Sequence, residues 1–332
     1  MEGSTVSFEQ RAISRRDFIT NLLRLGGLSA ASVGMGAWLK SRSQRPQEQF
    51  IAGRAQRVAI PPDPNFPEMV VVYGRDPRQL IQRAVAELGG ITRFIAPGEV
   101  VLIKPNIAWD RTPEQAANTN PQAVGEMVRL CRSAGAKTVI VTDVSCNDPR
   151  RCFQRSGIAE EASAAGAKVI LPEKQGFKEI DFQGKVLNVW PVFAPFLEAT
   201  KVINMAAAKH HSLTGVTLGM KNWYGIIGGR RSQLHQQINE SIVDLADFMR
   251  PALTIIDAYR VLIRNGPTGG NLADVVMKNT IIAGTDPVAL DAYAAKTYWD
   301  LDYHRLPFLK LAHERGLGNM HFSQVRSKVV EI

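Results

Sequence analysis

From residue 69 onward, short β-branched runs alternate with stretches of helical character, and this alternation constrains the fold more than any other feature. Most of the runs are apolar throughout, which is typical of strands that are buried on both faces. Asp76-Pro77 and Asn120-Pro121 each place a capping residue before a proline at the first position of a helix. The pattern predicts an α/β fold, Rossmann-like, in which a mostly parallel sheet carries helices on both faces.

The expected elements follow from these runs. The strands should cover residues 69–73, 100–103, 138–142, 167–171, 201–205, 253–256 and 279–283. The helices should begin near 76 and 120, cover 158–165 and 287–299, and include a long amphipathic helix over 232–250. Residues 179–182 and 186–190, joined across Gly184, indicate a small hairpin insertion beside the sheet.

The first forty residues resemble a twin-arginine export signal. Arg15 and Arg16 precede a Phe-Ile pair and an apolar segment that extends to residue 39. We therefore expect the twin-arginine translocase as a partner and a periplasmic or cell-envelope location. Arg24 interrupts the segment, and Trp38 and Lys40 leave no clean cleavage site. Cleavage at a poor site and retention as an inner-membrane tether both remain open.

The chain divides into three parts on this basis. Residues 1–40 are the signal or anchor, residues 41–67 are a polar and then Pro-rich linker, and residues 68–332 are an α/β domain of one body or two lobes. The net charge of +9 is concentrated in the leader. Residues 1–57 hold nine basic and four acidic residues, a net of +5, which leaves only +4 for the rest. Nucleic acid is therefore not expected as a partner.

The cysteines exclude one class of cofactor. Cys131, Cys146 and Cys152 are the only cysteines and contain no C-x-x-C pair, so no iron–sulfur cluster is expected from this chain. Cys131 lies in a predicted helix, where a buried thiol is usual. Cys146 and Cys152 lie six residues apart in a predicted loop, and the sequence leaves open whether they form a disulfide.

Polar residues follow five of the predicted strands. Open α/β sheets bind ligands beyond the carboxyl ends of their strands, so these five sets indicate one shared cleft. Lys104 directly follows an apolar run, and a buried ammonium group there needs a partner. The five sets are Lys104 with Asn106, Asp143, Lys209–His211, Asp257, and Asp286.

The richest segment runs from Lys209 to Asn222. Lys104, Lys209 and Lys221 would neutralise a carboxylate or phosphate, and we expect backbone N–H groups near residues 215 and 219, at a helix start, to add donors. His210 is the expected general acid or base, since imidazole titrates near neutral pH. Lys104, Lys209 and His210 are thus the candidate catalytic residues, and the candidate substrate-binding residues are Asn106, His211, Lys221 and Asn222.

A divalent metal is one version of this site. Asp143, Asp257 and Asp286 would hold a hard cation through carboxylate oxygens. For Asp286, which precedes Pro287, a helix N-cap is the favoured interpretation. Arg230 and Arg231, which follow two glycines, either extend the anion-binding surface or form a solvated loop.

These motifs together resemble the bacterial family known as domain of unknown function 362. The resemblance covers about residues 68–300 and implies an α/β fold and members that carry export signals. It assigns no reaction. Some relatives carry ferredoxin-like cysteine motifs, which this chain lacks. The matching segments, in order, are residues 102–106 with Lys-Pro-Asn, 135–143, 209–211, 218–225, 257 with 266–270, and 286–291.

The sequence therefore favours an exported α/β protein, enzyme-like, that binds a small anionic molecule in a cleft at the strand ends. Two other classes remain open. One is a non-catalytic periplasmic binding or accessory protein that uses the same cleft. The other is a redox partner whose cofactor is supplied by another chain.

Overall fold

The computed structural model describes Arg15, Arg16, Thr20 and residues 59–332. Arg15 and Arg16 are helical and exposed, and the Thr20 hydroxyl donates a hydrogen bond of 2.8 Å to the Arg16 carbonyl. The rest of the predicted export signal, and the predicted linker up to residue 58, lie outside the described residues. Within the described ranges, no helix combines the length and apolar character that crossing a membrane requires.

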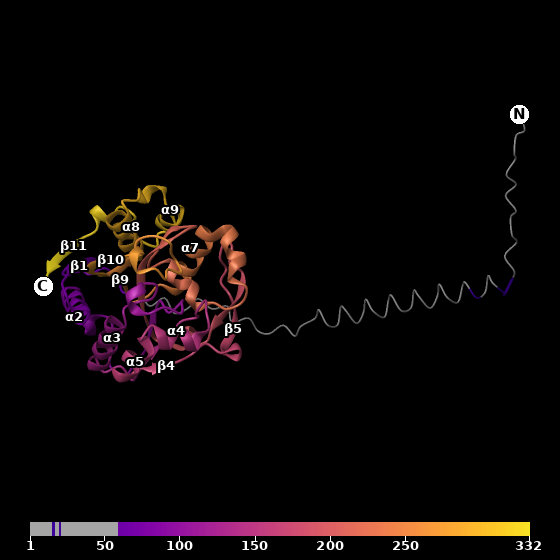
Figure 1. Cartoon of the computed structure of the whole chain (residues 1–332), viewed down its shortest axis with the longest axis horizontal. Coiled ribbons are helices and arrows are strands. Elements are labelled where there is room, and N and C mark those ends of the chain that lie inside the picture. The colour runs from indigo at the N-terminus through magenta and orange to yellow at the C-terminus, as the bar shows by residue number, and fades with distance from the viewer. Residues whose placement is uncertain (1–14, 17–19, 21–58) are drawn as a thin grey trace, which may run out of the picture. The chain divides into compact units, whose positions relative to one another are not determined.

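A mixed and mostly parallel sheet forms the centre of residues 59–332 (Figure 1), which confirms the predicted fold class. The main sheet has the order β11-β1-β10-β9-β7-β2-β3-β4, with β8 paired to β7, while β5 and β6 form the separate antiparallel hairpin. β10 runs antiparallel to both its neighbours, and β4, β3, β2, β7 and β9 are parallel. The strands are β1 (Met69–Tyr73), β2 (Val100–Pro105), β3 (Thr138–Val141), β4 (Lys168–Val169), β5 (Phe177–Asp181), β6 (Val189–Phe193), β7 (Lys201–His211), β8 (Gly215–Thr217), β9 (Leu253–Leu262), β10 (Val275–Gly284) and β11 (Ser327–Glu331).

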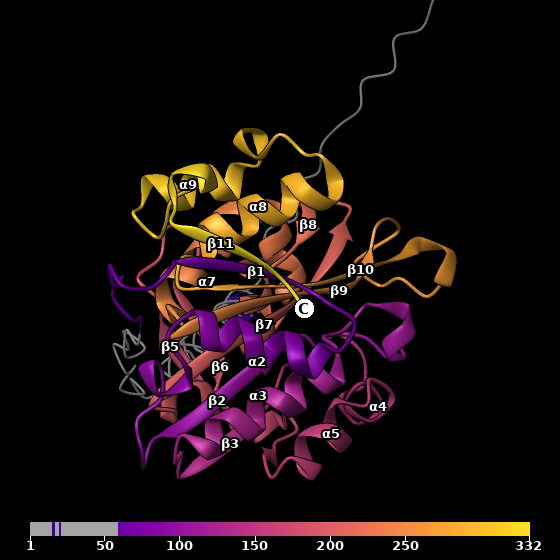
Figure 2. The ribbon, with the colours of Figure 1, turned by 90° about the vertical axis from the view of Figure 1, so that its left-hand side faces the viewer.

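Helices cover both faces of this sheet, and Figure 2 shows the two layers with the strands between them. Successive strand residues point to opposite faces, so Met69 and Val71 of β1 enter one core while Val70 and Val72 enter the other. The first core packs against α7, α8 and α9, and the second against α2, α3 and α5. The helices are α2 (Pro77–Glu87), α3 (Pro121–Ser133), α4 (Pro149–Arg155), α5 (Ile158–Ala164), α6 (Pro195–Glu198), α7 (Ile238–Met249), α8 (Pro287–Trp299) and α9 (Pro307–Glu314).

Two segments differ from the predicted elements in ways that matter for the site. β7 continues through three buried alanines to His211, because β8 folds back on it as a hairpin and pairs with residues 209–211. Residues 215–217 are therefore a strand, and the predicted helix start near residue 215 is wrong. The predicted helix over 232–250 is also shorter, since a 3₁₀ helix (Arg231–Gln237) precedes α7.

Candidate functional site: a cationic cavity at the strand ends

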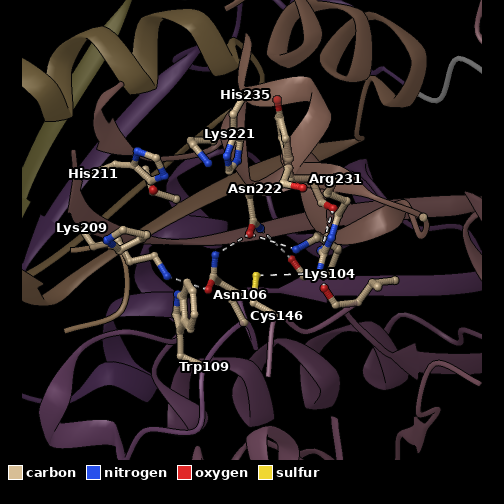
Figure 3. A pocket seen from close by; sticks show the side chains of 18 of the residues that line it. Lys104, Asn106, Trp109, Cys146, Lys209, His211, Lys221, Asn222, Arg231 and His235 are labelled. Atoms are coloured by element: carbon tan, nitrogen blue, oxygen red, sulfur yellow. Dashed lines mark hydrogen bonds between the residues drawn. The ribbon is translucent and has the colours of Figure 1, made fainter. Parts of the chain in front are cut away.

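A cavity of about 390 Å³ lies where β2, β3 and β7 end (Figure 3). None of its lining residues in the described part of the chain is acidic. Six of the predicted site residues line it: Lys104, Asn106, Lys209, His211, Lys221 and Asn222. The lining does not include His210, Asp143, Asp257 or Asp286.

Lys104 is held at the end of β2 by a buried ion pair. β2 and β3 are parallel and Ile103 is in register with Val141, so Asp143 lies just beyond the strand end next to Lys104. The Lys104 Nζ lies 2.6 Å from the Asp143 Oδ1 and donates to the Asn222 Oδ1 at 3.0 Å. Burial lowers the pKa of Lys104, and the charge of Asp143 opposes this. The partner that a buried ammonium requires is thus Asp143.

Lys209 is equally buried, but it has no such counter-charge. Its Nζ donates to the Asn106 Oδ1 at 3.0 Å and to the Ala117 carbonyl. Within residues 59–332 no carboxylate oxygen lies within 4 Å of this ammonium group. Burial lowers its pKa to about 7. Lys209 therefore exchanges a proton near neutral pH.

Lys221 begins a 3₁₀ helix (Lys221–Ile226) that forms another wall of the cavity. The turn before it is fixed by Asp291 of α8, whose carboxylate accepts from the Gly219 and Met220 N–H groups at 2.8 and 3.0 Å. The Lys221 ammonium lies 4.8 Å from the centre of the Tyr224 ring, and no carboxylate of the described region is within 4 Å of it. Burial lowers its pKa to about 8.

Amide side chains connect these lysines. The Asn106 Nδ2 donates to the Asn222 Oδ1 at 3.0 Å, and the Asn222 Nδ2 donates to the Asn204 Oδ1 at 2.8 Å. The Asn204 Nδ2 donates to the Gly219 carbonyl at 2.8 Å. Asn204 was not among the predicted site residues. Its signal in the sequence is an amide inside an otherwise apolar run over residues 202–208.

The two adjacent histidines separate because they lie on a strand. Lys209 and His211 are two residues apart on β7 and share the face that lines the cavity, whereas His210 points to the other face. The His210 Nδ1 accepts from the Gly266 N–H at 3.2 Å. Burial, followed by the charges of Lys221 and Lys209, lowers the pKa of His211 to about 3, so its ring is neutral. The structure does not bring the candidate acid–base residue His210 to the cavity.

The three aspartates of the predicted metal set are not brought together either. Each one satisfies backbone N–H groups at a different place. Asp143 accepts from Ile107 at 2.6 Å, Asp257 from Asn120 at 2.6 Å, and Asp286 caps α8 and also accepts from Asn319 at 2.7 Å. Among the described residues, no three His, Cys, Asp or Glu side chains form a group that could hold a metal ion. The favoured N-cap interpretation of Asp286 is confirmed.

Several lining residues lie outside the candidate catalytic and substrate-binding set, and Arg231 is the most informative of them. Its guanidinium donates to the Val144 and Ser145 carbonyls at 2.8 and 2.7 Å and so fastens the loop after β3. Arg231 thus extends the cationic surface, as one of the two predicted alternatives states. The additional lining side chains include Trp109, Cys146, Thr217, Tyr224, Arg231 and His235.

The cysteines are all free, so the Cys146–Cys152 disulfide is not formed in this structure. Burial raises the pKa of Cys131 to about 12 and that of Cys152 to about 11. Cys152 donates a weak hydrogen bond to the Ala108 carbonyl. Cys146 alone is exposed.

Comparison with known proteins places the chain in a family. Residues 101–296 match the family described as "Domain of unknown function (DUF362)", and because this is more than half of the sequence, the chain belongs to that family. It is 25% identical over 239 residues to a thylakoid-associated protein of Synechocystis sp., a match that covers 70% of this chain and 72% of that protein.

Two solved structures show a weak similarity to this chain, with low TM-scores and low sequence identity. The lactate racemase apoprotein of Thermoanaerobacterium thermosaccharolyticum has a TM-score of 0.43 and 12% identity, over 68% of this chain and 56% of that one. A protein of Thermotoga maritima has a TM-score of 0.37 and 12% identity, over 73% and 60% of the two chains. The chain therefore matches little more than half the length of the racemase, and no functional residue is transferred from either structure.

Proposed function

We propose that this protein binds a small anionic molecule, a carboxylate or a phosphate, in the cavity lined by Lys104, Lys209 and Lys221. One observation carries the proposal. Lys209 and Lys221 are buried with no carboxylate of the described region within 4 Å, and none of the described residues that line the cavity is acidic. A buried charge needs a counter-charge, and here an incoming anion would supply it.

The size and the electrostatics of the cavity agree with this function. Its volume of about 390 Å³ falls in the range of small-molecule sites, roughly 300–1,000 Å³. Burial lowers the pKa of Lys209 to about 7 and that of Lys221 to about 8. Keeping both amines charged therefore costs free energy in the protein without a bound anion. An anion between them would raise both pKa values again and stabilise the folded chain.

Catalysis is favoured over passive binding by the state of Lys209. The pKa of Lys209 is about 7 in the free protein, so Lys209 takes up a proton at neutral pH when the anion binds and can then donate it to the bound molecule, which suits a general acid. In this version Lys104 and Lys221 orient the anion, while Asn106 and Asn222 position the amines. A non-catalytic periplasmic binding or accessory protein would use the same contacts without the proton transfer, and a redox partner would need a cofactor from another chain.

Thermal denaturation tests the binding site. Millimolar phosphate, or one member of a panel of small mono- and dicarboxylates, should raise the melting temperature of the purified chain by several degrees. Lys221→Gln should abolish this rise, because it removes a cavity charge without removing an ion pair. Lys310→Gln on the exposed face of α9 is the matched control and should keep it. Equal stabilisation of the Lys221→Gln variant would contradict the proposed site.

We also propose that the chain is exported by the twin-arginine route, on the strength of Arg15, Arg16 and the apolar segment behind them. Replacing both arginines with lysine should retain the protein in the cytoplasm of the producing bacterium, as cell fractionation and immunoblotting would show. Undiminished appearance of the double variant in the periplasm or membrane fraction would contradict this route. The same blot reports by size whether the signal is removed.

A further inference from the structure

Cys146 places a thiol inside the cationic cavity. It lies three residues beyond Asp143 in the loop after β3, and its N–H group donates to the Ala108 carbonyl at 2.9 Å. Its side chain is exposed and lines the cavity, and Figure 3 shows a dashed line from the sulfur to Arg231. Anion binding by the three lysines does not use this thiol.

One cationic side chain contacts the sulfur, and two more influence it through their charge. The Arg231 Nη2 lies 3.8 Å from the Cys146 Sγ and donates to it. Burial lowers the pKa of Lys209 and of Lys221, and in both cases the charge of a Cys146 thiolate is the next largest influence and opposes the shift. The sulfur is therefore within electrostatic reach of the two lysines that have no carboxylate partner.

Two polar groups of the same cavity point to a ligand, and the buried Thr217 hydroxyl does so independently of the lysines. The Thr217 hydroxyl, on a residue only 4% exposed, has no hydrogen-bond partner in the described part of the chain. The Lys221 ammonium, on a residue only 9% exposed, has no hydrogen bond or carboxylate partner among the same residues and faces the cavity (Figure 3). Buried polar groups are rarely left unpaired, so these groups await a polar occupant of the cavity that Cys146 also lines.

We propose that Cys146 is a nucleophile that forms a covalent bond with a small anionic electrophile, which the cationic groups of the cavity hold. This inference rests on the proposed anion-binding function. In the step, the Cys146 thiolate attacks the electrophilic atom of the bound anion. A bond from sulfur to that atom forms as the bond to the leaving group breaks, and the leaving group departs with the electron pair. The proton of the thiol goes to solvent. Cys131 and Cys152 are excluded from this chemistry by their burial.

Iodoacetate and iodoacetamide test the inference, because they transfer similar groups to a thiol and release iodide but differ in charge. The full chain would be treated at pH 7, and alkylation at each cysteine followed by peptide mass spectrometry. The ratio of the iodoacetate rate to the iodoacetamide rate at Cys146 should be at least about tenfold larger in the folded chain than in urea, since a cationic cleft concentrates anions by about 10- to 1,000-fold. Lys221→Gln should lower this ratio several-fold, and Lys310→Gln should leave it unchanged.

The outcomes separate the two proposals. No preference for iodoacetate at folded Cys146, with phosphate or a carboxylate still raising the melting temperature, overturns the covalent role and leaves anion binding standing. Absence of both the preference and the thermal stabilisation overturns the anion site itself. Cys146→Ser should abolish alkylation at this position while the anion-induced rise in melting temperature persists, which shows that the thiol is not needed for binding.

Discussion

Replacing Lys104 with methionine is expected to lower the free energy of unfolding by about 3–5 kcal/mol, because breaking a buried ion pair leaves an uncompensated charge. The charge left behind is that of Asp143. Its carboxylate would keep only the hydrogen bond from the Ile107 N–H while it remains buried beside Gly225. Urea denaturation of the purified variant would measure the loss.

A double variant shows whether the charge or the packing is responsible. Lys104→Met combined with Asp143→Asn removes both charges, and the asparagine oxygen still accepts from Ile107. The double variant should regain most of the lost stability, since a neutral pair avoids the desolvation penalty. A double variant as unstable as the single one would show that the Lys104 stem is required for packing and that its ion pair matters little.

Anion affinity is expected to fall about tenfold between pH 7 and pH 8 and about fiftyfold between pH 8 and pH 9. In the free protein Lys209 and Lys221 lose their protons with pKa values of about 7 and about 8, so an anion that requires both charges must take up protons as the pH rises. Isothermal titration calorimetry with a small carboxylate, whose own charge is constant over this range, in buffers of different ionisation enthalpy, would measure the affinity and the proton uptake together. A flat affinity over this range would contradict the assignment.

The stability of the free chain should change in the opposite direction. The pKa of Lys209 is lowered by burial from its usual value near 10.5, so between about pH 7 and pH 10 the unfolded chain binds more protons than the folded one. Stability from this group therefore increases as the pH rises through that window. Lys209→Met should weaken both this increase and the pH dependence of anion affinity, which serves as the internal control.

Short sequence motifs correctly predicted where two helices begin. Asp76 and Asn120 cap α2 and α3 as expected, because the capping residue and the following proline act within one turn. The grouping of Lys104 and Lys209 followed from one rule, that the carboxyl ends of parallel strands meet at one edge of the sheet. Lys221 does not follow a parallel strand, and the turn that brings it to the cavity is held by Asp291 of α8.

Contacts between distant segments determine the features that the sequence did not predict. The length of β7 depends on β8, which offers hydrogen-bond partners to residues 209–211, and only the strand geometry turns His210 away from the cavity. The Asp257 carboxylate likewise accepts a hydrogen bond from the Asn120 N–H group, which lies 137 positions away in the chain. Arg231 reaches the loop after β3 from a distant segment.

The turn that carries Lys221 is attached on two sides, to α8 through Asp291 and to β7 through Asn204. Because this turn is held from two sides, it does not close over a bound anion. The cavity is therefore preorganised, and little conformational entropy is lost at this turn when an anion binds. Selection among anions then rests on size and charge spacing set in advance by the packing of a helix against a strand. Substitutions at Asp291, outside the cavity lining, would change which anions fit.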